Sequence, residues 1–146
     1  MTKVETANDY QAFATTHSIT KLDEEFGEAI EKLEAMSFDV TGQPLDPVFR
    51  RALRSVQLSF YALGVGGESG EVLDKVKKGM RGDYDIAVMP EENRRAIGLE
   101  LGDALWYIAN EAHQLGYTLT EIMQMNVDKL EDRRARGVSR GDGDNR

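Results

Sequence analysis

Residues 64–79, GVGGESGEVLDKVKKG, decide the fold because polar and apolar side chains recur in them at helical spacing. Positions separated alternately by three and four residues share one face of a helix. One face of this stretch therefore carries charged groups: Glu68, Glu71, Lys75 and Lys78. A neighbouring face is small or apolar, and we expect it to be core: Leu58, Ala62, Val65, Ser69, Val72 and Val76. The pattern predicts a long amphipathic helix with acidic groups on one side.

Two glycines inside this helix are unexpected. Each of Gly67 and Gly70 costs about 1 kcal/mol relative to alanine in a helix interior. We therefore expect each to have a structural reason, such as the close approach of another helix or of a ligand.

The rest of the chain has the same helical periodicity, interrupted by Pro44, Pro47 and Pro90. No stretch alternates polar and apolar residues over the length of a strand. The expected helices, after a short amphipathic segment at 8–16, lie at about 21–36, 48–78, 91–115 and 118–136. A linker is expected at 37–47, and Gly116 and Thr118 mark a tight turn. We predict one all-α domain over residues 1–146, a bundle of about four to five helices.

Composition limits the class of function. The chain has a net charge of −8, which disfavours binding to duplex nucleic acid, and it has no cysteine for a disulfide or zinc–thiolate site. It has no apolar run of membrane-spanning length and no apolar signal peptide core. We expect a cytoplasmic protein without a membrane partner. A small anionic ligand stays possible if metal ions or local basic groups offset its charge.

A second acid pair occurs in residues 98–116, GLELGDALWYIANEAHQLG, where Glu100 and Asp103 share a helix face. Each of two predicted helices thus presents two carboxylates at i, i+3. Helix packing that brought all four together would create strong repulsion unless a cation neutralised it. Oxygen ligands without His or Cys select Mg²⁺, or alternatively Mn²⁺, rather than zinc.

An alternative is that the acids form ordinary solvated pairs one helical turn apart, Glu71 with Lys75 and Asp74 with Lys78. Against this, Glu68 has no basic residue at position 72. Glu100 and Asp103 also lack one within four positions C-terminal to them. Their own helices do not neutralise these three acids.

The last predicted helix places Asn126 in an apolar stripe, with Lys129 and Arg133 beside it. A buried amide needs hydrogen-bond partners, so Asn126 either has a structural role or, with the two cations, holds sugar or phosphate groups.

Other nucleotide motifs are missing. GVGGESG fits neither GxGxxG nor a P-loop, and the Glu-x-x-His pairs of a di-iron bundle are absent.

Three segments together resemble the MazG-like all-α nucleoside triphosphate pyrophosphohydrolases. They are GESGEVLDKVKK (67–78), ELGDALWYIANEAHQLG (100–116) and NVDKLEDRRARG (126–137), which match in order the E-x-x-E helix, the E-x-x-D helix and the trailing Asn/Lys/Arg helix of that family. The resemblance covers about residues 52–137, with a weaker similarity at Tyr10 and Gln11. Residues 17–50 look like an insertion, and 137–146 like a mobile tail.

The resemblance implies an enzyme that hydrolyses a (d)NTP to a (d)NMP and pyrophosphate and assembles as a homodimer or tetramer. It also implies roles for individual residues. The Mg²⁺ ligands would be Glu68, Glu71, Glu100 and Asp103, with Glu71 as the catalytic base, and the substrate-binding residues would be Lys75, Lys78, Asn126, Lys129 and Arg133.

Two other interpretations stay open. Phosphoribosyl-ATP pyrophosphohydrolase, from the same superfamily, is a rival assignment. A helical oligomerisation or regulatory module without catalysis is the other, although it would be expected to have lost one of the four acids. The sequence does not determine the nucleobase or sugar preference.

Overall fold

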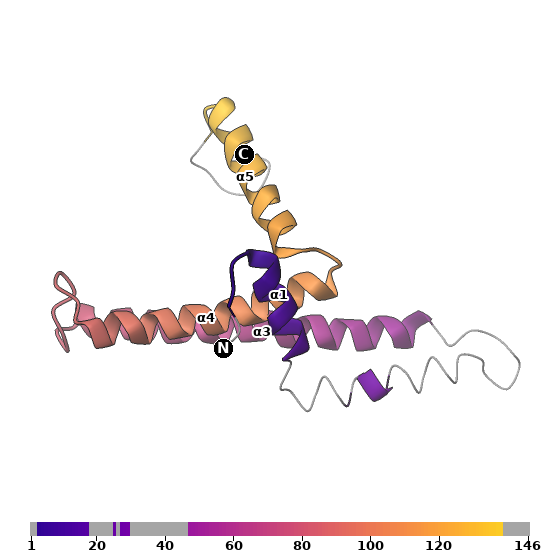
Figure 1. Ribbon diagram of the computed structural model, residues 1–146, viewed down its shortest axis with the longest axis horizontal. Helices are drawn as coiled ribbons and strands as arrows, with labels where there is room; N and C mark the ends of the chain where they lie inside the picture. Colours follow the sequence, from indigo (N-terminus) through magenta and orange to yellow (C-terminus); the bar gives the residue numbers. More distant parts are fainter. Residues whose placement is uncertain (1–2, 18–24, 26, 30–46, 139–146) are drawn as a thin grey trace, which may run out of the picture.

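The computed structural model describes residues 3–17, 25, 27–29 and 47–138, and within those ranges it contains helices and no strand. The helices are α1 (Ala7–Thr16), α3 (Pro47–Met80), α4 (Glu91–Gln114) and α5 (Leu119–Ala135) (Figure 1). The predicted all-α class is confirmed. The predicted helix at 21–36, the linker at 37–47 and the tail at 137–146 lie mostly outside the described residues.

Helices α3 and α4 form a long antiparallel hairpin, which is the largest helix–helix contact of the described chain (Figure 1). Their ends agree with the predicted segments 48–78 and 91–115 to within two residues. The connecting loop folds back on the end of α3. The ring of Tyr84 packs over Gly79, where a Cβ atom would lie 2.7 Å from it, and the Tyr84 hydroxyl donates to the Lys75 carbonyl at 2.8 Å.

Helix α1 packs on α4 near the start of α5 and completes a small core. The buried residues of that core are Ala14, Ala109, Ala112 and Leu119, and Trp106 packs against them. Three of the four are alanines, which let the helix backbones approach closely. Trp106 therefore has a packing role.

Gln11 of α1 is buried and joins α1 to the turn between α4 and α5. Its amide nitrogen donates to the carbonyls of Tyr117, at 2.8 Å, and Ala109, at 3.3 Å, while its amide oxygen accepts from Leu119 N at 2.9 Å. Asn8 accepts from Thr120 N at 3.2 Å. Because the first backbone N–H groups of a helix lack partners within it, α1 side chains cap α5.

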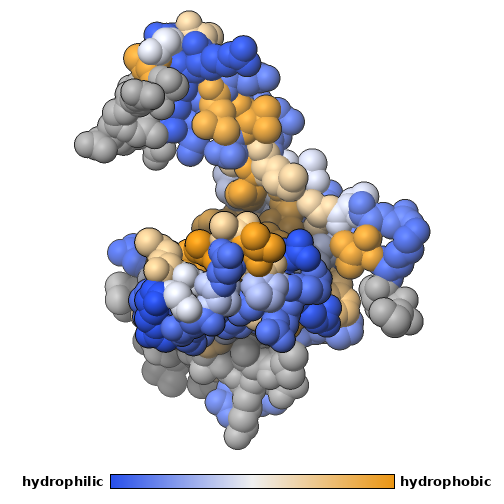
Figure 2. Space-filling model, turned by 90° about the vertical axis from the view of Figure 1, so that its left-hand side faces the viewer, coloured by the Kyte–Doolittle hydropathy of each residue, from blue (hydrophilic) through white to orange (hydrophobic). Residues whose placement is uncertain are grey.

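Helix α5 leaves the hairpin at a steep angle and projects away from it (Figure 1). Its predicted apolar stripe is buried only near its start, and Met123 and Leu130 are exposed. Asn126 is exposed too, so the expectation of a buried amide is wrong for the single chain. Figure 2 shows apolar side chains on the surface of both the projecting arm and the hairpin. None of the described helices is both long and apolar enough to cross a membrane.

Replacement of Gln11 tests whether α1 fixes the start of α5. Gln11→Ala removes all three hydrogen bonds and leaves the Leu119 N–H without its acceptor, so we expect the free energy of unfolding to fall by about 2 kcal/mol. Denaturant unfolding followed by the fluorescence of Trp106, the single tryptophan, measures it. Gln124→Ala on the exposed side of α5 is the control and should cost less than about 0.5 kcal/mol. Equal losses would mean that the Gln11 bonds do not hold α5.

Candidate metal centre

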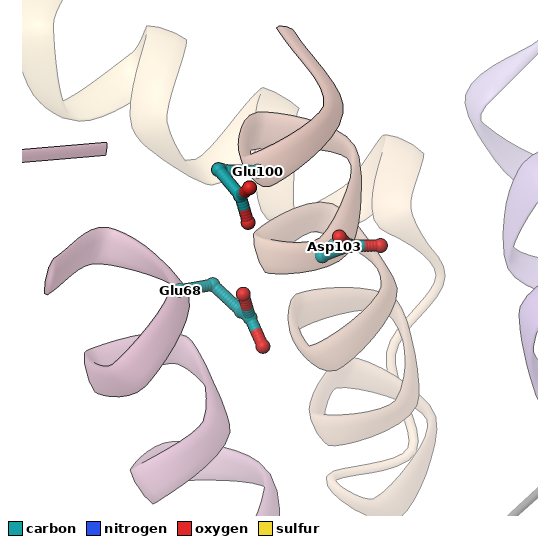
Figure 3. Close-up of side chains that lie close together, drawn as sticks. All are labelled: Glu68, Glu100 and Asp103. Atoms are coloured by element: carbon teal, nitrogen blue, oxygen red, sulfur yellow. The ribbon is translucent and has the colours of Figure 1, made fainter. Parts of the chain in front are cut away.

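Three of the four predicted metal ligands come together between α3 and α4. Each of Glu68, Glu100 and Asp103 offers a carboxylate oxygen, and these oxygens lie within 4.8 Å of one another. Figure 3 shows Glu68 on α3 and Glu100 on α4 pointing into the space between the helices, with Asp103 one turn further along α4. The two glutamates are half-buried and the aspartate is exposed.

A glycine allows the two helices to approach at this point. Gly64 lies one turn before Glu68 on α3, and a Cβ atom there would overlap the ring of Tyr107 on α4. Tyr107 follows Asp103 by one turn, so the glycine–tyrosine contact lies directly beside the acids. Around it, Tyr107 packs edge-on against Trp106, with ring centroids 5.0 Å apart, and against Phe60 at 6.1 Å. The spacing that brings Glu68 to α4 is therefore set by packing.

Glu71 lies outside this three-acid cluster, where a lysine stands between it and the cluster. The Lys75 ammonium is 2.7 Å from Glu100 Oε1 and 3.9 Å from Glu71 Oε2. The Glu71 side chain is 61% exposed, whereas those of Lys75 and Glu100 are 24% and 20% exposed. Both same-helix pairs expected from spacing are present, since Asp74 also contacts Lys78 at 2.7 Å. Glu68 and Asp103 are not neutralised by those pairs.

Burial and the neighbouring acids raise the pKa of Glu68. Burial raises the pKa of its carboxyl above the usual value of 4.5, and repulsion from Asp103, Glu100 and Glu71 raises that pKa further. Tyr10 of α1 borders the same site. Its hydroxyl donates to the Gly102 carbonyl at 3.1 Å, and burial together with the nearby Asp103 charge raises the pKa of its phenol.

The donors suit a hard divalent cation. Two oxygens on opposite sides of a hexacoordinate Mg²⁺ are about 4.2 Å apart, so three oxygens within 4.8 Å of one another need to move only slightly to share one ion. No histidine belongs to the cluster and the chain has no cysteine, which disfavours zinc.

The predicted substrate-binding residues are divided between two parts of the molecule. Lys75 lies at the cluster, and Lys78 lies one turn further along α3, paired with Asp74. Asn126, Lys129 and Arg133 are on α5, which projects away from the hairpin (Figure 1). Arg133 is buried and Asn126 exposed. One chain therefore does not bring the α5 group to its own acids.

Gly67 and Gly70 do not make the close helix contact that was one of the two expected reasons for them, and the approach of a ligand stays a prediction. A Cβ atom at Gly67 or Gly70 would meet no described atom within 4 Å, so the expected approach of another helix is not found there. Gly64 has that role instead. Its signal was its position on the same helix face as Glu68 and Glu71. Tyr10 was noticed only through the resemblance, because α1 is distant in sequence from the acids.

Comparisons with known proteins agree with this geometry. Residues 58–138 match the MazG nucleotide pyrophosphohydrolase domain, and they include all of the acids above. The chain belongs to the MazG family. It is 47% identical over 89 residues to the Gene 37 protein of Mycobacterium phage L5, a match that covers 61% of this chain and 76% of that protein. No solved structure matches the chain.

The role of Gly64 in this MazG domain can be tested against Gly67 on the same helix. Gly64→Ala should lower the free energy of unfolding by about 1–3 kcal/mol because the new methyl group displaces the Tyr107 ring. Gly67→Ala meets no neighbour and should raise it by up to about 1 kcal/mol through helix propensity. Thermal unfolding of both variants without metal gives the comparison, and a stabilising Gly64→Ala would contradict the proposed spacing role.

The raised pKa of Glu68 predicts the sign of a pH effect in metal-free protein. Between pH 4.5 and its higher folded pKa, the folded state binds more protons than the unfolded state, so stability falls as pH rises through this window. Glu68→Gln removes the charged carboxylate and with it the cost of its burial and repulsion. We therefore expect its melting temperature in EDTA to exceed that of the wild type by about 1–4 °C at pH 8 and to match it near pH 4.

Glu92→Gln is the matched control, because Glu92 is an exposed acid in the first turn of α4, the other helix of the hairpin. The Glu92 carboxylate interacts favourably with the positive end of the helix dipole, so its removal should not raise the melting temperature at pH 8. A Glu68→Gln variant less stable than the wild type at pH 8 would show that the Glu68 carboxylate stabilises the fold.

Proposed function

We propose that this protein is a Mg²⁺-dependent nucleoside triphosphate pyrophosphohydrolase that cleaves a (d)NTP to a (d)NMP and pyrophosphate. The observation that carries the proposal is the convergence of Glu68, Glu100 and Asp103 within a MazG domain. Such a cluster costs stability when it is left uncompensated, as the raised Glu68 pKa indicates. A site that is unfavourable for folding is typical of a functional role.

The three clustered acids, with Glu71 as a fourth ligand, would hold the metal ion. These residues would hold Mg²⁺, which would offset phosphate charge and lower the pKa of a bound water. Glu71 is our choice of general base because its side chain is 61% exposed and lies outside the three-acid cluster, where it could accept a proton from a water molecule. Lys75 and Lys78 lie on the same side of α3 and would contact phosphate oxygens.

Asn126, Lys129 and Arg133 are proposed to hold the nucleotide from α5, and this requires more than one chain. Large apolar residues are exposed along the hairpin and the arm, among them Leu63, Leu73, Leu99, Leu101, Leu105, Met123 and Leu130 (Figure 2). Extended apolar surface of this kind is typical of an interface. Self-association as a dimer or tetramer would cover it and allow α5 of one copy to approach the acids of another.

The direct test is a panel of ribo- and deoxyribonucleoside triphosphates with Mg²⁺, assayed for pyrophosphate release. We expect at least one substrate to give a monophosphate and pyrophosphate, with no activity in EDTA. Glu68→Gln and Asp103→Asn should each lower kcat by at least about 100-fold, because each removes a charged ligand from the cluster.

Glu92→Gln serves as the control and should retain wild-type kinetics, since Glu92 is an exposed acid on the same helix as Asp103 and outside the cluster. Release of orthophosphate instead of pyrophosphate would contradict the reaction type. Activity on phosphoribosyl-ATP alone would assign the rival substrate. Absence of turnover on the whole panel, with the protein folded, would favour a module without catalysis.

A further inference from the structure

Lys75 contacts two of the four predicted ligands, Glu71 on its own helix and Glu100 on α4. Its ammonium lies between Glu71 and Glu100, 3.9 Å and 2.7 Å from their nearest oxygens. It is the group that separates Glu71 from the three-acid cluster. Its side chain is only 24% exposed, so the ammonium lies against the hairpin and not free in solvent. The structure thus shows a metal site with a cation already at one edge.

One ammonium cannot occupy that position together with a divalent ion that uses the same oxygens. Glu100 belongs to the cluster and accepts the short contact from Lys75 through one of its two oxygens. An ion bound by Glu71 as well as Glu100 would place two like-charged centres within a few ångströms of each other. Their repulsion is large at this separation, even with solvent nearby. Either Lys75 moves, or Glu71 stays outside the site.

We propose that Lys75 is an internal counter-cation that holds the acids together in the metal-free protein and is displaced when a divalent ion binds. The inference rests on the proposed function, because it takes Glu68, Glu71, Glu100 and Asp103 as the ligand set. It assigns Lys75 two successive positions. In the first it neutralises Glu100, and in the second it is released toward the solvent side of the cluster, where phosphate groups would arrive.

The neighbouring lysines cannot take this role. Lys77 and Lys78 both contact Asp74, at 2.6 Å and 2.7 Å, on the part of α3 beyond the cluster. Lys75 alone among these three contacts an acid of α4. Its backbone is also held, because the Tyr84 hydroxyl donates to its carbonyl at 2.8 Å. A fixed backbone with a flexible four-carbon side chain suits a group that changes partner without disturbing the helix.

Lys75→Met tests the proposal because methionine keeps an unbranched side chain and removes the charge. In EDTA its melting temperature should fall below that of the wild type, since Glu100 loses its partner. Mn²⁺ affinity, measured by calorimetry without nucleotide, should become at least about fivefold tighter because the competing cation is gone. Lys77→Met is the matched control and should leave Mn²⁺ affinity within twofold of the wild type.

Unchanged or weaker Mn²⁺ binding by a folded Lys75→Met variant would overturn the counter-cation role and leave the metal site intact. Failure of the wild type itself to bind Mn²⁺ would instead overturn the proposed function. The two failures are thus distinguished by the wild-type measurement alone.

Wild-type protein gives a second test that needs no variant. Acetylation of lysines, followed by mass spectrometry, should modify Lys75 several-fold faster with saturating Mg²⁺ than in EDTA, because its ion pair with Glu100 is broken. Lys77 should react equally under both conditions. If Mg²⁺ leaves the acetylation rate of Lys75 unchanged or lowers it, the ammonium keeps its place. That result would contradict displacement.

Discussion

The close approach of α3 and α4 at Gly64 and Tyr107 is the contact on which the acidic site depends. Without a side chain at Gly64, the tyrosine ring packs against the α3 backbone, and the next turn of each helix brings Glu68 opposite Glu100 and Asp103. Like charges would otherwise push these turns apart. Packing, together with the ion pair between Lys75 and Glu100, must therefore supply the free energy that holds the carboxylates within reach of one another.

That packing is mainly aromatic. Tyr61 is almost fully buried, and its ring lies 6.2 Å from that of Trp106, which in turn packs edge-on against Tyr107. Large rigid rings bury much apolar area and keep defined geometry, so they resist the splaying that repulsion favours. The aromatic residues lie on the core side of the hairpin and the acids one turn away. The aromatic packing and the acidic cluster thus lie next to each other on the same two helices.

The helices and the acid pairs could be predicted from sequence because each depends on local spacing. The i, i+3 pairs on α3 and α4 require only the helical repeat, and three of those four carboxylates do converge. The contact between the Tyr107 ring and Gly64 could not be predicted, because it depends on which residue of α4 lies opposite Gly64. The ion pair between Lys75 and Glu100 is likewise a contact between helices.

The prediction that Asn126 is buried on α5 was wrong for a different physical reason. Its periodicity correctly gave a helix, and Thr118 with Glu121 forms the capping box at its start. Periodicity identifies an apolar face but does not say which surface covers it, and in the single chain Met123 and Leu130 are exposed.

Helix α1 limits how α5 can be oriented relative to the hairpin, because α1 contacts both α4 and α5. Tyr10 bonds the α4 backbone beside Asp103, while Gln11, the next residue, bonds the first turn of α5. The direction of α5 is therefore tied to the same short helix that borders the acids. Carboxylates that attract a metal lie on the hairpin, and the cations Lys129 and Arg133 lie on the arm. The proposed metal–triphosphate complex would need both kinds of group, and in one chain they stand apart. Under the proposed self-association, the direction of α5 would therefore determine how a second copy docks to bring them together.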